Sequence, residues 1–168
     1  MPNPQDLIEL LQLEPLPVEG GYFRRTYCSD ETIDRDALPM RYSQAKALGS
    51  AIYFFLHGAE FSALHRLQSD EVYHFYRGDP VELLLLFPDG SSEVRLLGPA
   101  LEAGQQPQVV VRRGVWQGAR LSSGGHYALM GTTLAPAYDP TDFELGEREI
   151  LIQQYPTRAE LIRALTRA

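Results

Sequence analysis

Hydrophobic and polar residues alternate along the central part of the chain in a series of short runs. A β-strand repeats every two residues, so such alternation places apolar side chains on one face. Turn residues such as Gly78-Asp79-Pro80 and Pro88-Asp89-Gly90-Ser91 separate the runs. Closely spaced short strands are typical of a β-sandwich or barrel. The pattern therefore predicts an all-β fold with strands near 51–56, 61–67, 71–77, 81–87, 93–97, 107–112, 115–121 and 126–134.

The two ends of the chain have helical patterns. Asn3 is a suitable N-cap for a helix that starts at Pro4 and carries an apolar stripe, Leu7, Leu10, Leu11 and Leu13. A second helix is expected to start at Thr157, with Glu160 at capping-box spacing. Residues 18–27 are strand-like, 29–48 form a long polar connection, and 137–148 form an ordered loop over the barrel. No repeat or linker interrupts the pattern, so we expect a single domain over 1–168.

Composition and charge exclude several classes of partner. The net charge is −7 and the pI is near 5.1, which disfavours binding to nucleic acid or to an anionic membrane surface. No apolar run approaches the ~20 residues of a membrane helix, and the first residues lack a signal-peptide pattern, so a cytoplasmic location is expected. Cys28 is the sole cysteine, which excludes an intrachain disulfide and a multi-cysteine zinc site.

A histidine and a carboxylate occupy neighbouring strands of this pattern. His65 shares a strand face with Phe61, Ala63 and Leu67. Glu71 shares a face of the following strand with Tyr73 and Phe75. Both series are expected to point inward, so the two groups should meet in a largely apolar enclosure where burial shifts pKa values. The pattern predicts a site but does not name a reaction.

The segment from His65 to Gly78 resembles the first motif of the cupin superfamily: His-x-His, three or four residues, Glu, six residues, Gly. His65, Glu71 and Gly78 match, and Leu67 stands at the second histidine position. Residues 112–117 resemble the second motif, Pro-x-Gly-x-x-His. Gly114 matches there, Arg112 replaces the proline, and Gln117 replaces the histidine.

Further segments, EGGYFRRTY, SAIYFFL, GVWQGAR and DFELGERE, resemble a branch of short uncharacterised cupins of unknown function. This resemblance implies a double-stranded β-helix (a jelly roll), usually dimeric, with structural similarity to dTDP-sugar epimerases and seed storage cupins. It brings no established reaction. Exchange of an N-terminal strand, together with the outward series Val72, His74 and Tyr76, is expected to build a homodimer.

A cupin metal normally binds to three histidines and a glutamate, whereas the matching positions here offer His65, Glu71 and Gln117. Transition metals prefer imidazole to amide oxygen, so a hydrogen-bonded polar cluster is favoured over a metal site. No cofactor is expected, and a divalent transition metal on these three residues is the alternative.

Several other side chains are candidates for the same cavity. One of Arg24 and Arg25 should face it, and the other should face solvent or a partner subunit, because strand neighbours point to opposite sides. Tyr53, Tyr73 and Tyr76 are general acids, stacking platforms or core residues, and Trp116 either closes the barrel mouth or packs in the core. The assignments are His65, Glu71 and Tyr73 as catalytic, and Gln117, Arg24, Tyr53 and Trp116 as ligand-binding.

Three functions are open at this point. The first is binding of a small molecule with sugar or sugar-nucleotide isomerase or epimerase chemistry, in which His65 is the base and a tyrosine returns the proton. The epimerase likeness supports it only through the fold. The second is a ligand-binding protein without catalysis. The third is a metal-dependent oxygenase or isomerase.

Overall fold

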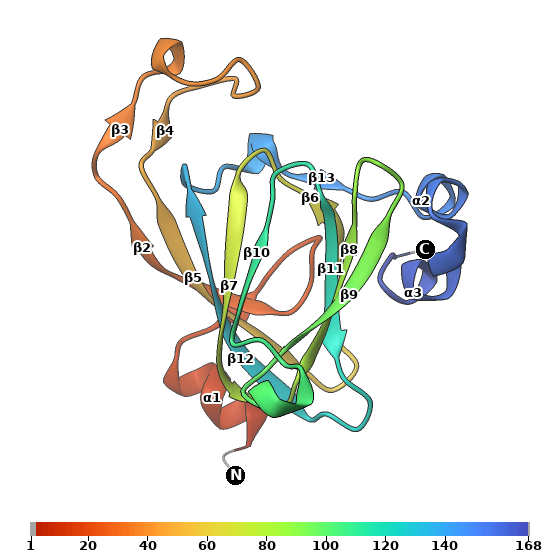
Figure 1. The fold of residues 1–168 in the computed structure, drawn as a ribbon. Helices are drawn as coiled ribbons and strands as arrows, with labels where there is room; N and C mark the ends of the chain where they lie inside the picture. Colours follow the sequence, from red (N-terminus) through yellow and green to blue (C-terminus); the bar gives the residue numbers. More distant parts are fainter. Residues whose placement is uncertain (1–2, 168) are drawn as a thin grey trace.

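Two antiparallel β-sheets face each other and enclose the apolar core (Figure 1). The structure is a computed structural model that describes residues 3–167. The six-stranded sheet contains, in spatial order, β1 (Glu14–Pro15), β2 (Tyr22–Cys28), β5 (Ser50–His57), β12 (Tyr127–Ala135), β7 (Asp70–Gly78) and β10 (Gln108–Val111). The five-stranded sheet contains β13 (Glu144–Leu145), β6 (Phe61–Arg66), β11 (Trp116–Leu121), β8 (Val81–Leu86) and β9 (Ser92–Leu97). The all-β prediction is confirmed.

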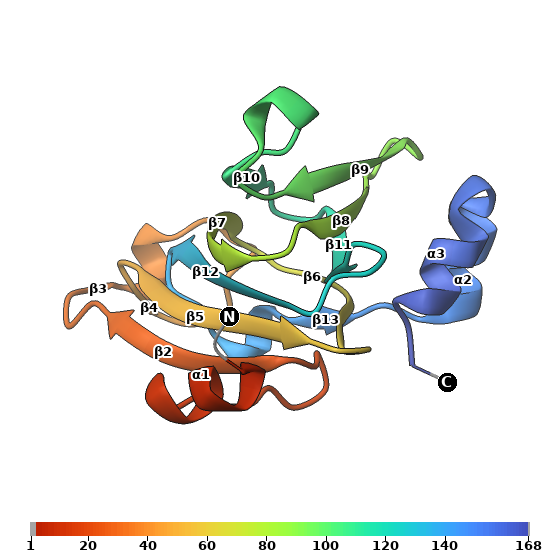
Figure 2. The ribbon, with the colours of Figure 1, turned by 90° about the horizontal axis from the view of Figure 1, so that it is seen from below.

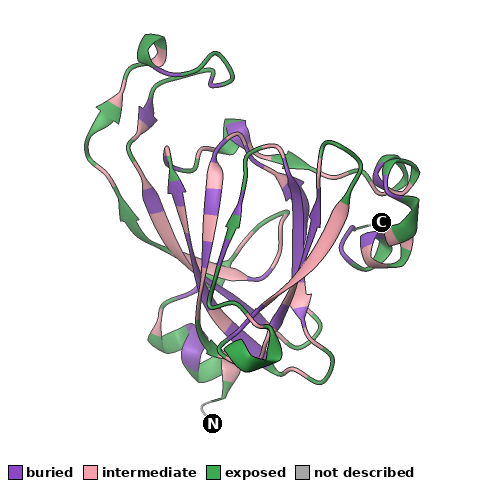
Figure 3. Ribbon diagram, in the orientation of Figure 1, coloured by how far each residue is buried: buried purple, intermediate pink, exposed green. Residues whose placement is uncertain are grey.

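Buried residues concentrate in the strands of both sheets (Figure 3). They form one apolar cluster between the sheets and two more on the outer faces, under the terminal helices. The run of four leucines in β8 shows why some strands lack alternation. Leu83 and Leu85 join the core between the sheets, whereas Leu84 and Leu86 pack under the C-terminal helices. β8 is therefore covered on both sides, as its unbroken apolar run predicts.

The first helix, α1 (Pro4–Leu10), begins as the sequence predicts: the Asn3 side chain accepts a hydrogen bond from the Gln5 backbone N–H. It packs on Phe55, on the outer face of the six-stranded sheet, through Leu7 and Ile8. Leu10, which the predicted apolar stripe includes, is 76% exposed because Ile8 takes the inward position.

The C-terminal region contains more helix than the pattern predicts. α2 (Arg148–Gln154) precedes the short 3-10 turn η4 (Pro156–Arg158) and α3 (Ala159–Ala164). No side chain caps α3, so the capping box expected at Thr157 does not form. These helices cover the outer face of the five-stranded sheet at its β8 and β11 strands (Figure 2).

Residues 29–48 form an arm rather than an irregular connection. The pair β3 (Thr32–Ile33) and β4 (Lys46–Ala47) carries the turn η1 (Arg35–Ala37) beyond the edge of the six-stranded sheet (Figure 1). The arm is attached to the barrel through Tyr42, whose hydroxyl lies 2.9 Å from Ser69 Oγ. Two further 3-10 turns, η2 (Leu101–Ala103) and η3 (Pro140–Asp142), lie in the loops.

Candidate ligand cavity

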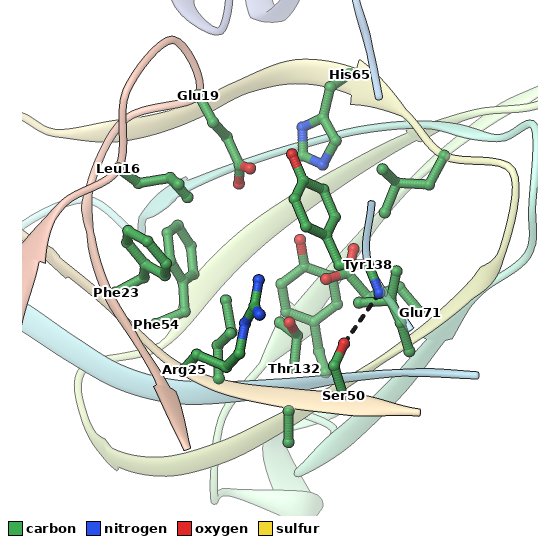
Figure 4. Close-up of a pocket in the computed structure, with 15 residues that line it drawn as sticks. Leu16, Glu19, Phe23, Arg25, Ser50, Phe54, His65, Glu71, Thr132 and Tyr138 are labelled. Carbon is green, nitrogen blue, oxygen red and sulfur yellow. Dashed lines mark hydrogen bonds between the residues drawn. The ribbon is translucent and has the colours of Figure 1, made fainter. Parts of the chain in front are cut away.

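A cavity of about 150 Å³ lies between the two sheets, at the level of His65 and Glu71 (Figure 4). β2, β5, β7 and β12 supply most of its wall, and β6 supplies His65. The loops before β2, between β6 and β7, and after β12 complete it. The wall is mainly apolar, with a few polar groups directed inward. Its residues are Leu16, Glu19, Phe23, Arg25, Ser50, Ala51, Ile52, Phe54, His65, Leu67, Glu71, Tyr73, Thr132, Leu134 and Tyr138.

His65 is held in one orientation by its neighbours. It lies on β6 between β11 and β13, opposite Gln117 and Leu145. Its ring stacks on Phe143 with the ring centroids 5.1 Å apart, and its Nδ1 is 2.7 Å from the Ala63 carbonyl oxygen. A carbonyl oxygen only accepts, so Nδ1 carries the hydrogen and Nε2 of the neutral ring keeps a lone pair. The side chain is buried, and its remaining contacts are inside the cavity.

Glu71 approaches the same space from the opposite sheet. Its carboxylate accepts a hydrogen bond of 2.9 Å from Gln117 Nε2, which joins β7 to β11 across the sandwich. Burial raises the pKa of the Glu71 carboxyl above its ordinary value, and the nearby His65 ring opposes that rise. Glu71 therefore keeps its proton to a higher pH than an exposed glutamate does.

Two phenols face the cavity. Tyr73 of β7 is fully buried, and burial, with smaller contributions from Glu71 and Glu19, raises its pKa well above the ordinary value. Tyr138 follows β12, and its backbone N–H donates to Ser50 Oγ at 3.0 Å. Burial also raises the pKa of Tyr138, with Glu19 the next cause. Its hydroxyl end and the His65 ring point toward each other (Figure 4). Both phenols therefore keep their protons at neutral pH.

Two buried polar atoms beside the cavity have no hydrogen-bond partner among residues 3–167. They are Thr132 Oγ1 and Gln117 Oε1. An unpaired buried acceptor or donor costs about 1–3 kcal/mol, and native proteins usually satisfy such groups. Thr132 lines the cavity directly, and its hydroxyl is near enough to Glu71 to lower the pKa of that carboxyl, so a ligand hydroxyl at this point would meet both side chains.

The structure brings together four of the residues that the sequence singles out. His65, Glu71 and Tyr73 line the cavity, and Gln117 is joined to it through Glu71. Phe61 is not on the inward face of β6, where the alternation predicts it. It packs toward the C-terminal helices. An irregularity in the β6–β11 register shifts the alternation between Phe61 and His65. The catalytic and binding roles of these residues remain predictions.

Arg24, Tyr53 and Trp116 lie outside the cavity, so their positions do not support the binding roles expected for them. Arg24 stands 5.5 Å over the ring of Tyr53 and donates to Gln12, on the outer face of the six-stranded sheet. Tyr53 makes an edge contact with Tyr76 there. Trp116 packs between the five-stranded sheet and the C-terminal helices. In each case strand alternation directs the side chain away from the space between the sheets.

The cavity wall also contains three polar residues that the sequence analysis does not name as site residues: Arg25, Glu19 and Tyr138. Arg25 is the other member of the arginine pair, and its apolar neighbour on the same face, Phe23, is the signal that identifies it as the inward one. Glu19 and Tyr138 are in loops, where no periodicity indicates a direction. Only the loop connections in three dimensions place them at the cavity.

The donor set does not fit a transition metal. Among residues 3–167, no group of three or more His, Cys, Asp or Glu side chains is arranged to hold one. The side chain of Leu67 lines the cavity where the cupin motif has its second histidine, and Gln117 directs its amide nitrogen to Glu71. We therefore derive no chemical step through a metal.

The two facing antiparallel sheets, with a cavity between them and the His65, Glu71 and Gly78 motif on consecutive strands, define a cupin-type jelly roll. Gly78 has φ +106°, and a Cβ there would collide with the Tyr127 carbonyl oxygen, so the motif glycine is a backbone requirement. The family model described as "Cupin superfamily (DUF985)" matches residues 5–146. The chain belongs to this family.

Solved structures agree with that assignment. Protein SO0799 from Shewanella oneidensis is 34% identical, with 99% of both chains covered and a TM-score of 0.87. A hypothetical protein from Leishmania major is 27% identical over 98% of both chains, with a TM-score of 0.86. Oxalate decarboxylase from Bacillus subtilis, at 13% identity, shares the fold alone: the TM-score is 0.53, over 92% of this chain and 38% of that one.

None of the curated proteins matches the chain. Over the part of the chain that the structure describes, every helix is too short or too polar to cross a membrane. The jelly roll with short helices at both ends is confirmed, and the comparisons assign no reaction to this chain.

Proposed function

We propose that the chain binds a small molecule in the cavity between its sheets and that His65 acts there as a general base. One observation carries the proposal. The contact of His65 Nδ1 with the Ala63 carbonyl leaves Nε2 as the ring's acceptor, on a buried imidazole that lines the cavity. A general base must be oriented before it is useful, and the stacking on Phe143 fixes the plane of the ring.

The phenols supply the second half of proton-transfer chemistry. A base that removes a proton from carbon needs an acid that returns one, and Tyr73 and Tyr138 keep their protons at neutral pH. In the proposed reaction His65 takes a proton from the carbon next to a carbonyl, and the electron pair moves onto the carbonyl oxygen. A phenol then protonates the same carbon from the other side as the carbonyl re-forms, which epimerises that carbon. If the proton returns instead to the former carbonyl carbon and a hydroxyl on the first carbon becomes the new carbonyl, the result is an isomerisation. In both cases the imidazolium and the phenolate exchange a proton through solvent, and there is no net oxidation.

The cavity size limits the substrate. A cavity of about 150 Å³ accepts a benzene-sized ligand in an engineered protein, so a ligand of a single ring fits here. A sugar ring suits this volume. A sugar nucleotide would have to keep its nucleotide outside, in the solvent.

Binding without catalysis is the second candidate, and one contact favours it. The Glu71 carboxylate is engaged by Gln117, and within residues 3–167 no hydrogen bond joins it to His65. A base that is oriented by a carboxylate is also stabilised in its charged form, whereas the Ala63 carbonyl orients His65 without supplying a full charge.

Deuterium exchange separates the two candidates. The wild type is incubated in D2O with ring-sized sugars and hydroxy acids that stabilise it in thermal-shift assays, and carbon-bound deuterium is measured by mass spectrometry. We expect exchange in the wild type and its loss in His65→Gln, with binding retained. His74→Gln is the matched control, because His74 bonds to Thr133 and Gln108 on the outer face.

Each outcome decides one part of the proposal. Binding without exchange in the wild type would support the non-catalytic candidate. Exchange that survives in His65→Gln would refute the assignment of His65 as the base.

A further inference from the structure

Arg25 is the arginine of the cavity, and none of the other lining residues is a lysine or arginine. Its guanidinium points into the cavity (Figure 4), while the residue as a whole is exposed. Within residues 3–167 it makes neither an ion pair nor a side-chain hydrogen bond. The chain carries 22 acidic against 15 basic residues, so acidic partners are plentiful. An arginine left unpaired at a cavity in such a chain is suited to an anionic ligand.

The neighbouring arginine shows the contrast. Arg24 is engaged on the outer face by the Tyr53 ring and by Gln12. The two residues are consecutive in β2 and carry the same charge, yet only Arg25 lines the cavity. A planar guanidinium with unused donors matches a carboxylate in a bidentate arrangement.

The end of the cavity opposite Arg25 carries an acidic side chain and hydroxyl groups. The carboxylate of Glu19 points inward from the loop before β2, across the cavity from Arg25 (Figure 4), and its Oε1 accepts from Ser62 Oγ at 2.7 Å. Glu19 and Arg25 form no ion pair. The remaining uncommitted groups at this level are hydroxyls, those of Tyr73, Tyr138 and Thr132.

These groups distinguish between a hydroxylated and an ammonium-bearing ligand. Hydroxyl side chains both donate and accept, and so do the hydroxyls of a ligand, so each can satisfy the other. An ammonium group only donates, so it would leave the hydrogens of both phenols without an acceptor. The Glu19 carboxylate accepts from a ligand hydroxyl as well as from an ammonium group, so it does not separate the two kinds of ligand. The phenols decide the preference, and they favour hydroxyls.

We propose that the ligand of this cavity is a small hydroxylated monocarboxylate, a sugar acid or hydroxy acid of about six to thirteen heavy atoms, whose carboxylate is bound by Arg25. This inference rests on the proposed binding function, and it adds the chemical class of the ligand. The hydroxyl end of the ligand lies toward Glu19, Tyr138 and Thr132, which places the carbon next to the carboxylate within the cavity that His65 lines.

Isothermal titration calorimetry with three ring-sized probes tests the assignment. D-glucuronate carries both features, D-glucose lacks the carboxylate, and cyclohexanecarboxylate lacks the hydroxyls. Leucine serves as the ammonium-bearing probe. We expect D-glucuronate to bind the wild type most tightly. Arg25→Gln should weaken it about ten- to a hundredfold, since charge-assisted hydrogen bonds are lost, and Arg24→Gln should leave it unchanged.

The outcomes separate this inference from the function on which it rests. If D-glucose binds as tightly as D-glucuronate, or if Arg25→Gln and Arg24→Gln behave alike, the carboxylate assignment is wrong while small-molecule binding stands. If leucine binds most tightly, the assignment of hydroxyl groups to the end of the ligand opposite its carboxylate is wrong. If none of the probes binds, the ligand class is refuted, and the proposed function is then judged by its own compound screen.

Discussion

At the scale of single residues, the cavity is defined by two polar groups from opposite sheets. His65 is oriented by a backbone carbonyl and an aromatic ring, and Glu71 by an amide from the facing sheet. Neither interaction needs a metal to form. The result is a histidine with an acceptor nitrogen beside a carboxyl group whose pKa is raised by burial.

Glu71 makes the folded state sensitive to pH. Its pKa is raised in the folded protein, so above the ordinary value of 4.5 the unfolded chain loses this proton first. The contribution of Glu71 to stability is fully present below 4.5 and is lost as the pH rises through the raised folded value. We expect the free energy of unfolding of the wild type, relative to Glu71→Gln, to fall with pH across this window. Urea denaturation at a series of pH values measures it, and a difference that stays constant with pH would contradict the account.

At the scale of elements, alternation in the sequence located the strands that carry His65, Glu71 and Tyr73, because a period of two is a direct consequence of strand geometry. It could not place Phe61, since the register irregularity between β6 and β11 reverses the local direction. It also could not place Tyr138 or Glu19, which are in loops whose path depends on contacts far away in the chain. The choice between Arg24 and Arg25 could be made from Phe23, because its spacing of two residues from Arg25 puts both side chains on one strand face.

One such distant contact holds the loop that carries Tyr138 and Phe143. Lys46 of the arm is buried, 2.8 Å from Asp142 and 3.8 Å from Asp139. Lys46→Met would leave the buried carboxylate of Asp142 uncompensated, so we expect a loss of about 3–5 kcal/mol in the free energy of unfolding. Faster hydrogen exchange over residues 136–143 should accompany it.

A surface pair provides the control for Lys46. Arg112 and Asp70 also approach to 2.7 Å, but the Arg112 side chain is 74% exposed. Arg112→Met should therefore cost at most about 1 kcal/mol. The double variant with Lys46→Met and Asp142→Leu should recover much of the lost stability. Equal costs for Lys46→Met and Arg112→Met would show that the buried pair does not hold the loop.

At the scale of the whole molecule, the six-stranded sheet has an open edge. Beyond its first two residues, which pair with β1, β2 has a strand neighbour only in β5 among residues 3–167. Tyr27 on this edge is 58% exposed. An open edge is a template for pairing with another chain. We propose that two copies associate through β2, which would place the interface beside Arg25 and the cavity that it lines.

Light scattering coupled to size exclusion tests the dimer. We expect twice the chain mass of 18.9 kDa for the wild type at micromolar concentration, and a shift toward the monomer for Tyr27→Glu. Leu101→Glu, at an exposed position on η2, is the matched control and should remain dimeric. If the wild type runs as a monomer, the proposed dimer through β2 is wrong.

The most direct test of the account is whether ligands enter the space between the sheets. Ile52 lines the cavity from β5, so Ile52→Trp is designed to fill it while leaving His65, Glu71 and Arg25 in place. A ¹⁹F NMR screen of ring-sized fluorinated hydroxy acids is run on the folded wild type and the folded variant side by side. We predict fragments that bind the wild type and lose binding in Ile52→Trp. Fragments that bind both proteins equally, or none that bind the wild type, would contradict the account.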